Sequence, residues 1–175
     1  RFENYRFIWC FVNPDMQDSA PFSPNTEIMK KGEYIRFFYY LLTSEVVIYN
    51  CGGFSYAPIR KNQFLIETGH GGGLQKRNGF MVKTKSSASN KGIALACKDI
   101  KLWIASDEMH GKIYVRKAMG YNGEILKSGY PRSDIFFEKT EVLRDEIKKR
   151  LGVEKDAYVV LYAPTFKGSE EKAVS

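Results

Sequence analysis

Short apolar runs recur along this chain and alternate with segments of helical periodicity. Runs typical of buried strands occupy residues 5–12, 45–49, 63–68, 102–105, 124–128 and 158–162. Helical patterns are expected at 33–43, from 106 to about 119, and from 133 or 134 to 151. This alternation predicts an α/β, Rossmann-like fold, in which helices cover both faces of a parallel sheet.

Two of these segments carry more specific expectations. We expect the polar segment at 84–91 to be a loop, and the last helix to turn its apolar residues inward. The first helical segment has an apolar stripe that we expect to pack in the core, formed by Tyr34, Phe37, Phe38, Leu41 and Leu42.

The size of the chain suits one large domain, or one domain with part of another. It has 175 residues, of which 43% are hydrophobic, enough to form a substantial core. It begins at Arg1 rather than at a methionine, and we expect it to be a piece of a longer protein. No apolar run reaches 18 residues, so no transmembrane helix is expected.

The three cysteines predict an intracellular protein. Cys10, Cys51 and Cys97 are odd in number, lie in or beside apolar segments and show no metal-binding spacing. We therefore expect reduced, mostly buried thiols.

Positive charge is concentrated in one segment, residues 74–101. This segment contains seven lysines and arginines but only one acidic residue, Asp99, and so carries most of the formal net charge of +7. Clustered cations attract nucleic acid, anionic lipid or a phosphate-rich substrate. A solvated basic loop is the alternative.

His70 follows the strand expected at 63–68 and is one of only two histidines. Ligands of open α/β sheets bind at the carboxyl ends of strands. The adjoining Gly71, Gly72 and Gly73 would let the backbone approach an anion, and Lys76 and Arg77 could bind phosphate. A neutral His70 could take a proton from an attacking hydroxyl group. Alternatively, His70 occupies a tight turn and has no chemical role.

Other known motifs fit poorly. Neither the P-loop pattern nor the dinucleotide pattern matches the glycines around His70. His110 lies in an expected helix, and we favour a structural role for it. No metal site is evident, and no cofactor is expected.

Four segments resemble, in order, the CDP-glycerol glycerophosphotransferase family of teichoic acid and capsule polymerases. HGGGLQKRNG, starting at His70, is similar to the family's His-Gly motif. GYNGEILKSGYPRSDIFF (120–137) is similar to its Gly-x-Pro-Arg-Asn-Asp segment, and VVLYAPTFKG (159–168) to the strand that opens its second domain. YIRFFYYLLTSEVVIYN (34–50) is similar to the helix and strand that precede the histidine motif.

This resemblance implies a GT-B-like architecture of two Rossmann-type domains. It assigns residues 1–134 to the N-terminal, acceptor-side domain, 135–153 to a connecting helix, and 154–175 to the first strand of a truncated nucleotide-binding domain. The implied reaction transfers glycerol phosphate or ribitol phosphate from a CDP-linked donor to a hydroxyl of a membrane-linked acceptor and releases CMP.

The resemblance also implies roles for individual residues. His70 matches the motif histidine, the proposed general base. Gly71, Gly72 and Gly73 would shape the turn, and Lys76 lies one place later than the motif lysine because Gln75 intervenes. Arg132 matches the motif arginine, as either a structural or a phosphate-binding residue. The chain departs from the pattern at Gly69, where the family has tryptophan, and at Ser133, where it has asparagine.

The implied partners are the CDP-linked donor, a lipid-linked polyphosphate acceptor and the anionic inner face of the cell membrane. The implied location is the cytoplasm, peripheral to that membrane. A GT-B glycosyltransferase that uses a nucleotide sugar is the second enzyme hypothesis. A basic nucleic-acid-binding module is disfavoured, because the aromatic residues follow core periodicity and do not lie among the cations.

Overall fold

The computed structural model describes residues 3–11, 24–30, 32–70, 79–82, 86–137 and 140–162. The chain forms two compact units, Arg1–Pro131 and Arg132–Ser175. The first unit contains both sheets. The assignment of 1–134, 135–153 and 154–175 to two domains and a connecting helix stays a prediction.

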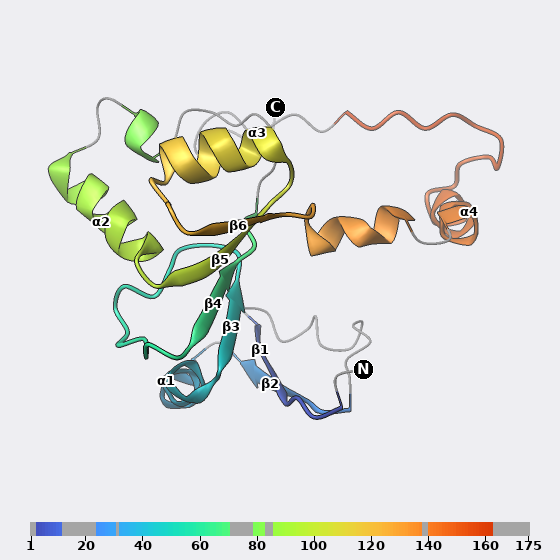
Figure 1. Ribbon diagram of the computed structural model, residues 1–175. Coiled ribbons are helices and arrows are strands. Elements are labelled where there is room, and N and C mark those ends of the chain that lie inside the picture. Colours follow the sequence, from blue (N-terminus) through green and yellow to red (C-terminus); the bar gives the residue numbers. More distant parts are fainter. Residues whose placement is uncertain are drawn as a thin grey trace. The chain divides into compact units, whose positions relative to one another are not determined.

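All strands of the first unit pair in parallel (Figure 1). One sheet pairs β1 (Phe7–Phe11) with β2 (Thr26–Lys30). The other runs in chain order through β3 (Val46–Tyr49), β4 (Phe64–Glu67), β5 (Ile100–Ala105) and β6 (Glu124–Lys127). The expected α/β fold with a parallel sheet is confirmed, although β2 was not predicted.

Helices connect these strands. They are α1 (Tyr34–Thr43), the 3-10 turn η2 (Gly79–Met81), α2 (Ser87–Cys97) and α3 (Glu108–His110), which continues as the π-helix η3 (Gly111–Ala118). The prediction of a loop at 84–91 is wrong for residues 87–91. The Ser86 hydroxyl accepts the Ser89 N–H at 3.2 Å and caps α2, and the opposite end of α2 is buried through Cys97.

The core lies between the four-stranded sheet and the helices α2 and η3. Its buried residues are Cys97, Ile100, Trp103, Val115 and Tyr121. On alternate positions of the strands, Val46, Ile48, Phe64 and Leu126 are 42–66% exposed. In the described part of the chain, helices therefore cover one face of the sheet, while side chains on the opposite face stay exposed.

The apolar stripe of α1 is less buried than predicted. Of its five residues only Leu41 is buried, and Tyr34 is 66% exposed. A polar network joins α1 to the two-stranded sheet instead. Glu27 on β2 accepts hydrogen bonds from Arg6, Arg36 and Tyr40. These contacts lower the pKa of Glu27 to about 2, and the hydrogen bond with Arg36 has the largest effect.

The second unit contains α4 (Thr140–Arg150) and, except for its first residue, the short helix η4 (Pro131–Phe137). The inward packing expected for the last helix is wrong, because Val142, Leu143, Ile147 and Leu151 are exposed. The buried strand expected at 158–162 is also wrong, because these residues are exposed and without regular structure. A strand needs a hydrogen-bonding neighbour, and the described residues of this unit supply no other strand.

Two further expectations concern cysteines and membranes. All three cysteines are free, but the expectation that most are buried is wrong, since Cys10 and Cys51 are exposed and only Cys97 is buried. Cys51 lies in the turn that follows β3, outside the core. No helix in the described part of the chain has the length and apolar character that a membrane span requires.

Candidate functional site

Four segments meet at the carboxyl edge of the four-stranded sheet. Because the strands are parallel, the residues after β3, β4, β5 and β6 all emerge at this edge, where α/β proteins bind their ligands. Asn50 follows β3, Thr68 to His70 follow β4, Asp107 follows β5, and Tyr130 follows β6.

His70 is exposed, and one of its two ring nitrogens is engaged. Its Nδ1 lies 3.0 Å from the main-chain carbonyl oxygen of Asn50. A carbonyl can only accept a hydrogen bond, so Nδ1 carries a hydrogen. In the neutral form of the ring, Nε2 then has the lone pair that can accept a proton.

The turn before His70 depends on glycine. Gly69 has a φ of +66°, a conformation that side chains rarely tolerate. The Gly69 N–H donates to Oε1 of Glu67 at 2.9 Å, and the Thr68 N–H donates to the Tyr49 carbonyl at 2.8 Å. At Gly69, where the family has tryptophan, a residue with a side chain would be strained by the positive φ. Its Cβ would lie 3.5 Å from the Tyr130 ring, which is ordinary van der Waals contact.

Glu67 is a carboxyl group buried beneath the turn. It ends β4, is 5% exposed and stands opposite Tyr49 and Trp103 in the sheet register. Burial raises the pKa of Glu67 to about 7, even though the Gly69 N–H and His70 act in the opposite direction. Glu67 therefore changes charge close to neutral pH.

A second polar cluster lies behind Gly69. His110 is 1% exposed, and its ring stacks on that of Tyr114 with centroids 5.1 Å apart. The Tyr130 hydroxyl lies 3.2 Å from Nε2 of His110. Burial lowers the pKa of His110 and so favours its neutral ring, which packs as part of the structure.

The structure does not relate the remaining predicted residues to His70. Gly71, Gly72, Gly73, Lys76 and Arg77 lie outside the described residues. Arg132 is exposed on η4, in the other unit of the chain. Their phosphate-binding roles stay predictions.

Sequence reasoning missed the groups that surround His70, namely Asn50, Glu67 and Tyr130. A signal existed for Glu67, because a carboxylate closes an otherwise apolar strand in the sequence FLIE. No signal existed for Asn50, because it contributes a main-chain carbonyl 20 residues away.

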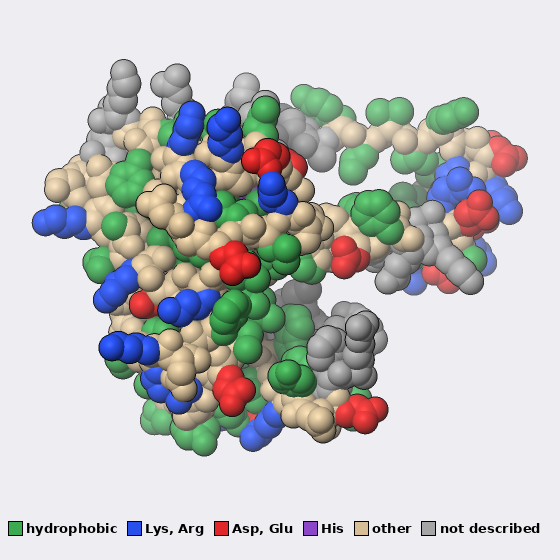
Figure 2. Space-filling model, in the orientation of Figure 1, with side chains coloured by type: hydrophobic (Ala, Val, Ile, Leu, Met, Phe, Trp, Pro, Cys, Tyr) green, Lys and Arg blue, Asp and Glu red, His purple; other side chains and the backbone are tan. Residues whose placement is uncertain are grey.

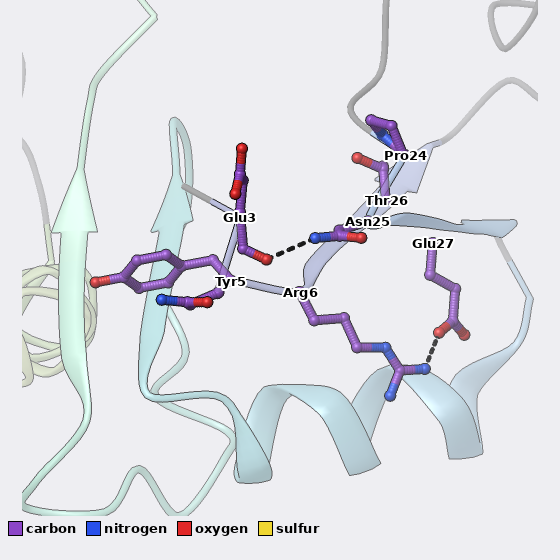
Figure 3. Close-up of a pocket in the computed structure, with 8 residues that line it drawn as sticks. Glu3, Tyr5, Arg6, Pro24, Asn25, Thr26 and Glu27 are labelled. Carbon is purple, nitrogen blue, oxygen red and sulfur yellow. Dashed lines mark hydrogen bonds and ion pairs between the residues drawn. The ribbon is translucent and has the colours of Figure 1, made fainter. Parts of the chain in front are cut away.

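A pocket elsewhere in this unit does not coincide with His70. It is lined by Glu3, Asn4, Tyr5, Arg6, Pro24, Asn25, Thr26 and Glu27, and Figure 3 shows the Asn25 side chain donating to the Glu3 carbonyl inside it. These residues precede or begin β1 and β2, so the pocket lies at the amino ends of these parallel strands. Ligand chemistry in this fold class belongs at the opposite edge. Within the described ranges, no group of three or more His, Cys, Asp or Glu residues could hold a metal ion.

Comparison with known proteins identifies the family of the chain. The family model for CDP-Glycerol:Poly(glycerophosphate) glycerophosphotransferase matches residues 1–175. A teichoic acid poly(glycerol phosphate) polymerase of Staphylococcus epidermidis is 29% identical, over 97% of this chain and 24% of its own length. A polymerase of the same description from Bacillus spizizenii is 25% identical, over 94% of this chain and 42% of its own length.

Solved structures of the wall teichoic acid polymerase TagF have the same fold. One variant matches with a TM-score of 0.79 and 28% identity, over 99% of this chain and 42% of that chain. Another, described as soaked with CDPG, matches with a TM-score of 0.76 and 27% identity, over 94% of this chain and 42% of that chain. The chain spans well under half the length of these relatives. Across its whole length, it belongs to the CDP-glycerol:poly(glycerophosphate) glycerophosphotransferase family.

Proposed function

We propose that this protein transfers a polyol phosphate from a CDP-linked donor to a hydroxyl group of a membrane-linked acceptor in teichoic acid or capsule synthesis. The family supports the reaction class, and the CDPG soaked into one TagF variant supports the donor class. A second, nucleotide-binding domain of a GT-B-like architecture would complete the donor site.

His70 is the general base of this proposal. The observation that carries it is the contact between its Nδ1 and the Asn50 carbonyl at 3.0 Å on an exposed ring. That contact assigns Nδ1 as the donor, so in the neutral ring Nε2 would be the proton acceptor, and His70 follows β4 at the edge of the sheet where α/β proteins bind their ligands.

The proposed step is a displacement at phosphorus. The acceptor oxygen attacks the β-phosphorus of the donor, and a new O–P bond forms as the bond between the β-phosphorus and the bridging oxygen breaks. Nε2 of His70 takes the proton of the acceptor hydroxyl, and CMP departs with the electrons of the broken bond. General-base assistance of this kind contributes about 10²- to 10⁴-fold in rate.

Phosphate binding falls to the glycine-rich and basic residues near His70. Main-chain N–H groups of Gly71, Gly72 and Gly73 would face the phosphate, and Lys76 and Arg77 would neutralise its charge. Arg132 would be either a further phosphate-binding cation or a structural residue.

We also propose that the basic segment holds the polyphosphate acceptor at the inner, anionic face of the cell membrane. Among its described residues, Lys91, Lys98 and Lys101 are exposed. Figure 2 shows further Lys and Arg side chains, outside this segment, gathered over the helix η3. Each well-placed cation contributes about 1 kcal/mol to binding an anionic surface. Binding to vesicles should therefore require anionic lipid and weaken with salt. Equal binding to neutral vesicles in high salt would refute this proposal.

Release of CMP tests the reaction. The full-length protein is given CDP-glycerol or CDP-ribitol with a lipid-linked phosphate acceptor, as wild type and as His70→Ala. We expect turnover of one donor and a loss of at least about 100-fold in the variant. Lys61→Ala, at an exposed residue before the amino end of β4, is the control and should retain wild-type turnover.

The outcomes separate the reaction from its mechanism. Turnover that survives in His70→Ala would keep the reaction and reject His70 as the base. Failure of both donors would reject the proposed reaction and direct the search to nucleotide sugars.

A further inference from the structure

Tyr130 packs directly against the turn that carries His70. A Cβ atom placed on Gly69 would lie 3.5 Å from both Cε1 and the hydroxyl oxygen of Tyr130, which is ordinary van der Waals contact. Tyr130 is 7% exposed. The Tyr130 ring therefore lies beside Gly69, next to the space that a side chain at this position would enter.

The strand that precedes Tyr130 is tied to the same edge of the sheet. The Gly129 N–H donates to the Ala105 carbonyl at the end of β5 at 3.3 Å. β6 pairs with β5 up to Lys127, opposite Ala105. Tyr130 thus reaches Gly69 from the segment that follows β6, and this proximity links the ends of β4 and β6 across β5.

His110 fixes the Tyr130 ring from behind. The two rings meet edge to face at 74°, with centroids 5.8 Å apart, and the Tyr130 hydroxyl lies 3.2 Å from Nε2 of His110. The ring of His110 is itself held by the parallel ring of Tyr114. Its main chain is held by Asp107, whose carboxylate accepts the main-chain N–H of His110 at 2.8 Å. His110 is 1% exposed, so it cannot meet a substrate directly.

We propose that Tyr130 and His110 are a pair of positioning residues that set the Gly69 turn and hold His70 with its Nδ1 on the Asn50 carbonyl. Neither residue touches the reacting atoms. The pair acts on the geometry of the base and not on its chemistry, and its effect on catalysis rests on the proposed function of His70.

Tyr130→Phe tests the pair with the smallest change. The variant keeps the ring that packs on Gly69 and removes the hydroxyl that contacts His110. We expect kcat in the full chain to fall about 10-fold while KM for the CDP-linked donor stays within about two-fold, because a displaced base slows the step without weakening binding. His110→Phe keeps a ring on Tyr114 but removes both nitrogens. It should likewise lower kcat and leave KM for the donor nearly unchanged.

Tyr121→Phe is the matched control. Tyr121 is also a buried tyrosine, and its hydroxyl lies 3.5 Å from the Ile100 carbonyl, at the other end of β5. We expect it to leave kcat unchanged.

The tautomer of His70 gives a readout that needs no turnover. In ¹⁵N spectra of the full chain, assigned with His70→Gln, wild-type His70 should show a protonated Nδ1 and a free Nε2. Tyr130→Phe should shift these signals toward a mixture of tautomers, and Tyr121→Phe should not. His70 signals and kcat that are both unchanged in Tyr130→Phe would overturn the proposal. If the wild type shows no transferase turnover, the reaction is refuted and the spectra alone decide the positioning role.

Discussion

Among the residues around His70, Glu67 is the one whose negative charge most lowers the free energy of unfolding. Its carboxyl group is buried at the end of β4, and its pKa is raised to about 7 from an ordinary value of 4.5. The folded protein therefore binds this proton more tightly than the unfolded chain does. Below about pH 4.5 the group is protonated in both states and costs nothing. Between pH 4.5 and 7 the free energy of unfolding falls, and above pH 7 the full cost is present.

Glu67→Gln should remove this dependence on pH. The neutral amide keeps the size of the side chain and an oxygen for the Gly69 N–H, so the variant should match the wild type at pH 4 and exceed its stability at pH 8. The gain is at most about 3 kcal/mol. Urea denaturation at both pH values measures it. Stability curves that run parallel from pH 4 to 8 would show that Glu67 titrates normally.

Two glycines in helical elements should respond differently to replacement by alanine, because the space around them differs. Gly79 begins η2 with a φ of +54°, and a Cβ there would lie 1.7 Å from the Ala118 carbonyl oxygen of η3. Gly92 lies within α2, and a Cβ there would meet no atom within 4 Å.

The same substitution should therefore act in opposite directions at these two positions. Gly79→Ala should destabilise the fold by at least about 2 kcal/mol, because the backbone of η2 or η3 must move. Gly92→Ala should stabilise it by about 0.5–1 kcal/mol through helix propensity. Thermal unfolding of the two variants measures the difference. A loss of stability in Gly92→Ala would mean that α2 is packed more tightly than the structure shows.

The elements differ in how far the sequence predicts them. β3, β4, β5 and β6 were predicted because each is a short apolar run with turn residues behind it. α2 was missed because its first half is rich in Ser and Asn, residues that favour turns, and its helix depends on the Ser86 cap and on burial of Cys97.

Among the described residues that meet at the carboxyl edge of the sheet, the sequence analysis singled out only His70. The stabilising partners of its turn come from other strands, and their contacts depend on tertiary structure that periodicity does not encode. The apolar run at 158–162 was misread for a related reason, since burial of a strand depends on neighbours and not on its own composition.

At the scale of the whole first unit, Glu27 links the two-stranded sheet to α1. It accepts from Arg6 on the segment before β1 and from Arg36 and Tyr40 on α1. The pKa of Glu27 is lowered from 4.5 to about 2 by these contacts. Their contribution to stability is therefore present above pH 4.5 and is lost as the pH falls from 4.5 to 2.

Glu27→Gln should lower the melting temperature at pH 7, because Arg6 and Arg36 lose their anionic partner. The difference from the wild type should shrink as the pH falls through 4.5 and vanish near 2. Glu33→Gln is the control, since the Glu33 carboxylate accepts from Arg36 but not from Arg6, and its effect should be smaller. A difference between wild type and Glu27→Gln that is independent of pH would show that packing, and not charge, is responsible.

The hydrogen bond that orients His70 has a consequence for how such a site can evolve. Its acceptor is the main-chain carbonyl of residue 50, which every amino acid provides. Substitution of residue 50 during evolution therefore leaves the imidazole ring oriented. Orientation of the base does not depend on a particular amino acid at this position. Relatives that diverge to 25–29% identity can keep this orientation while an alignment shows nothing at the position that supplies it.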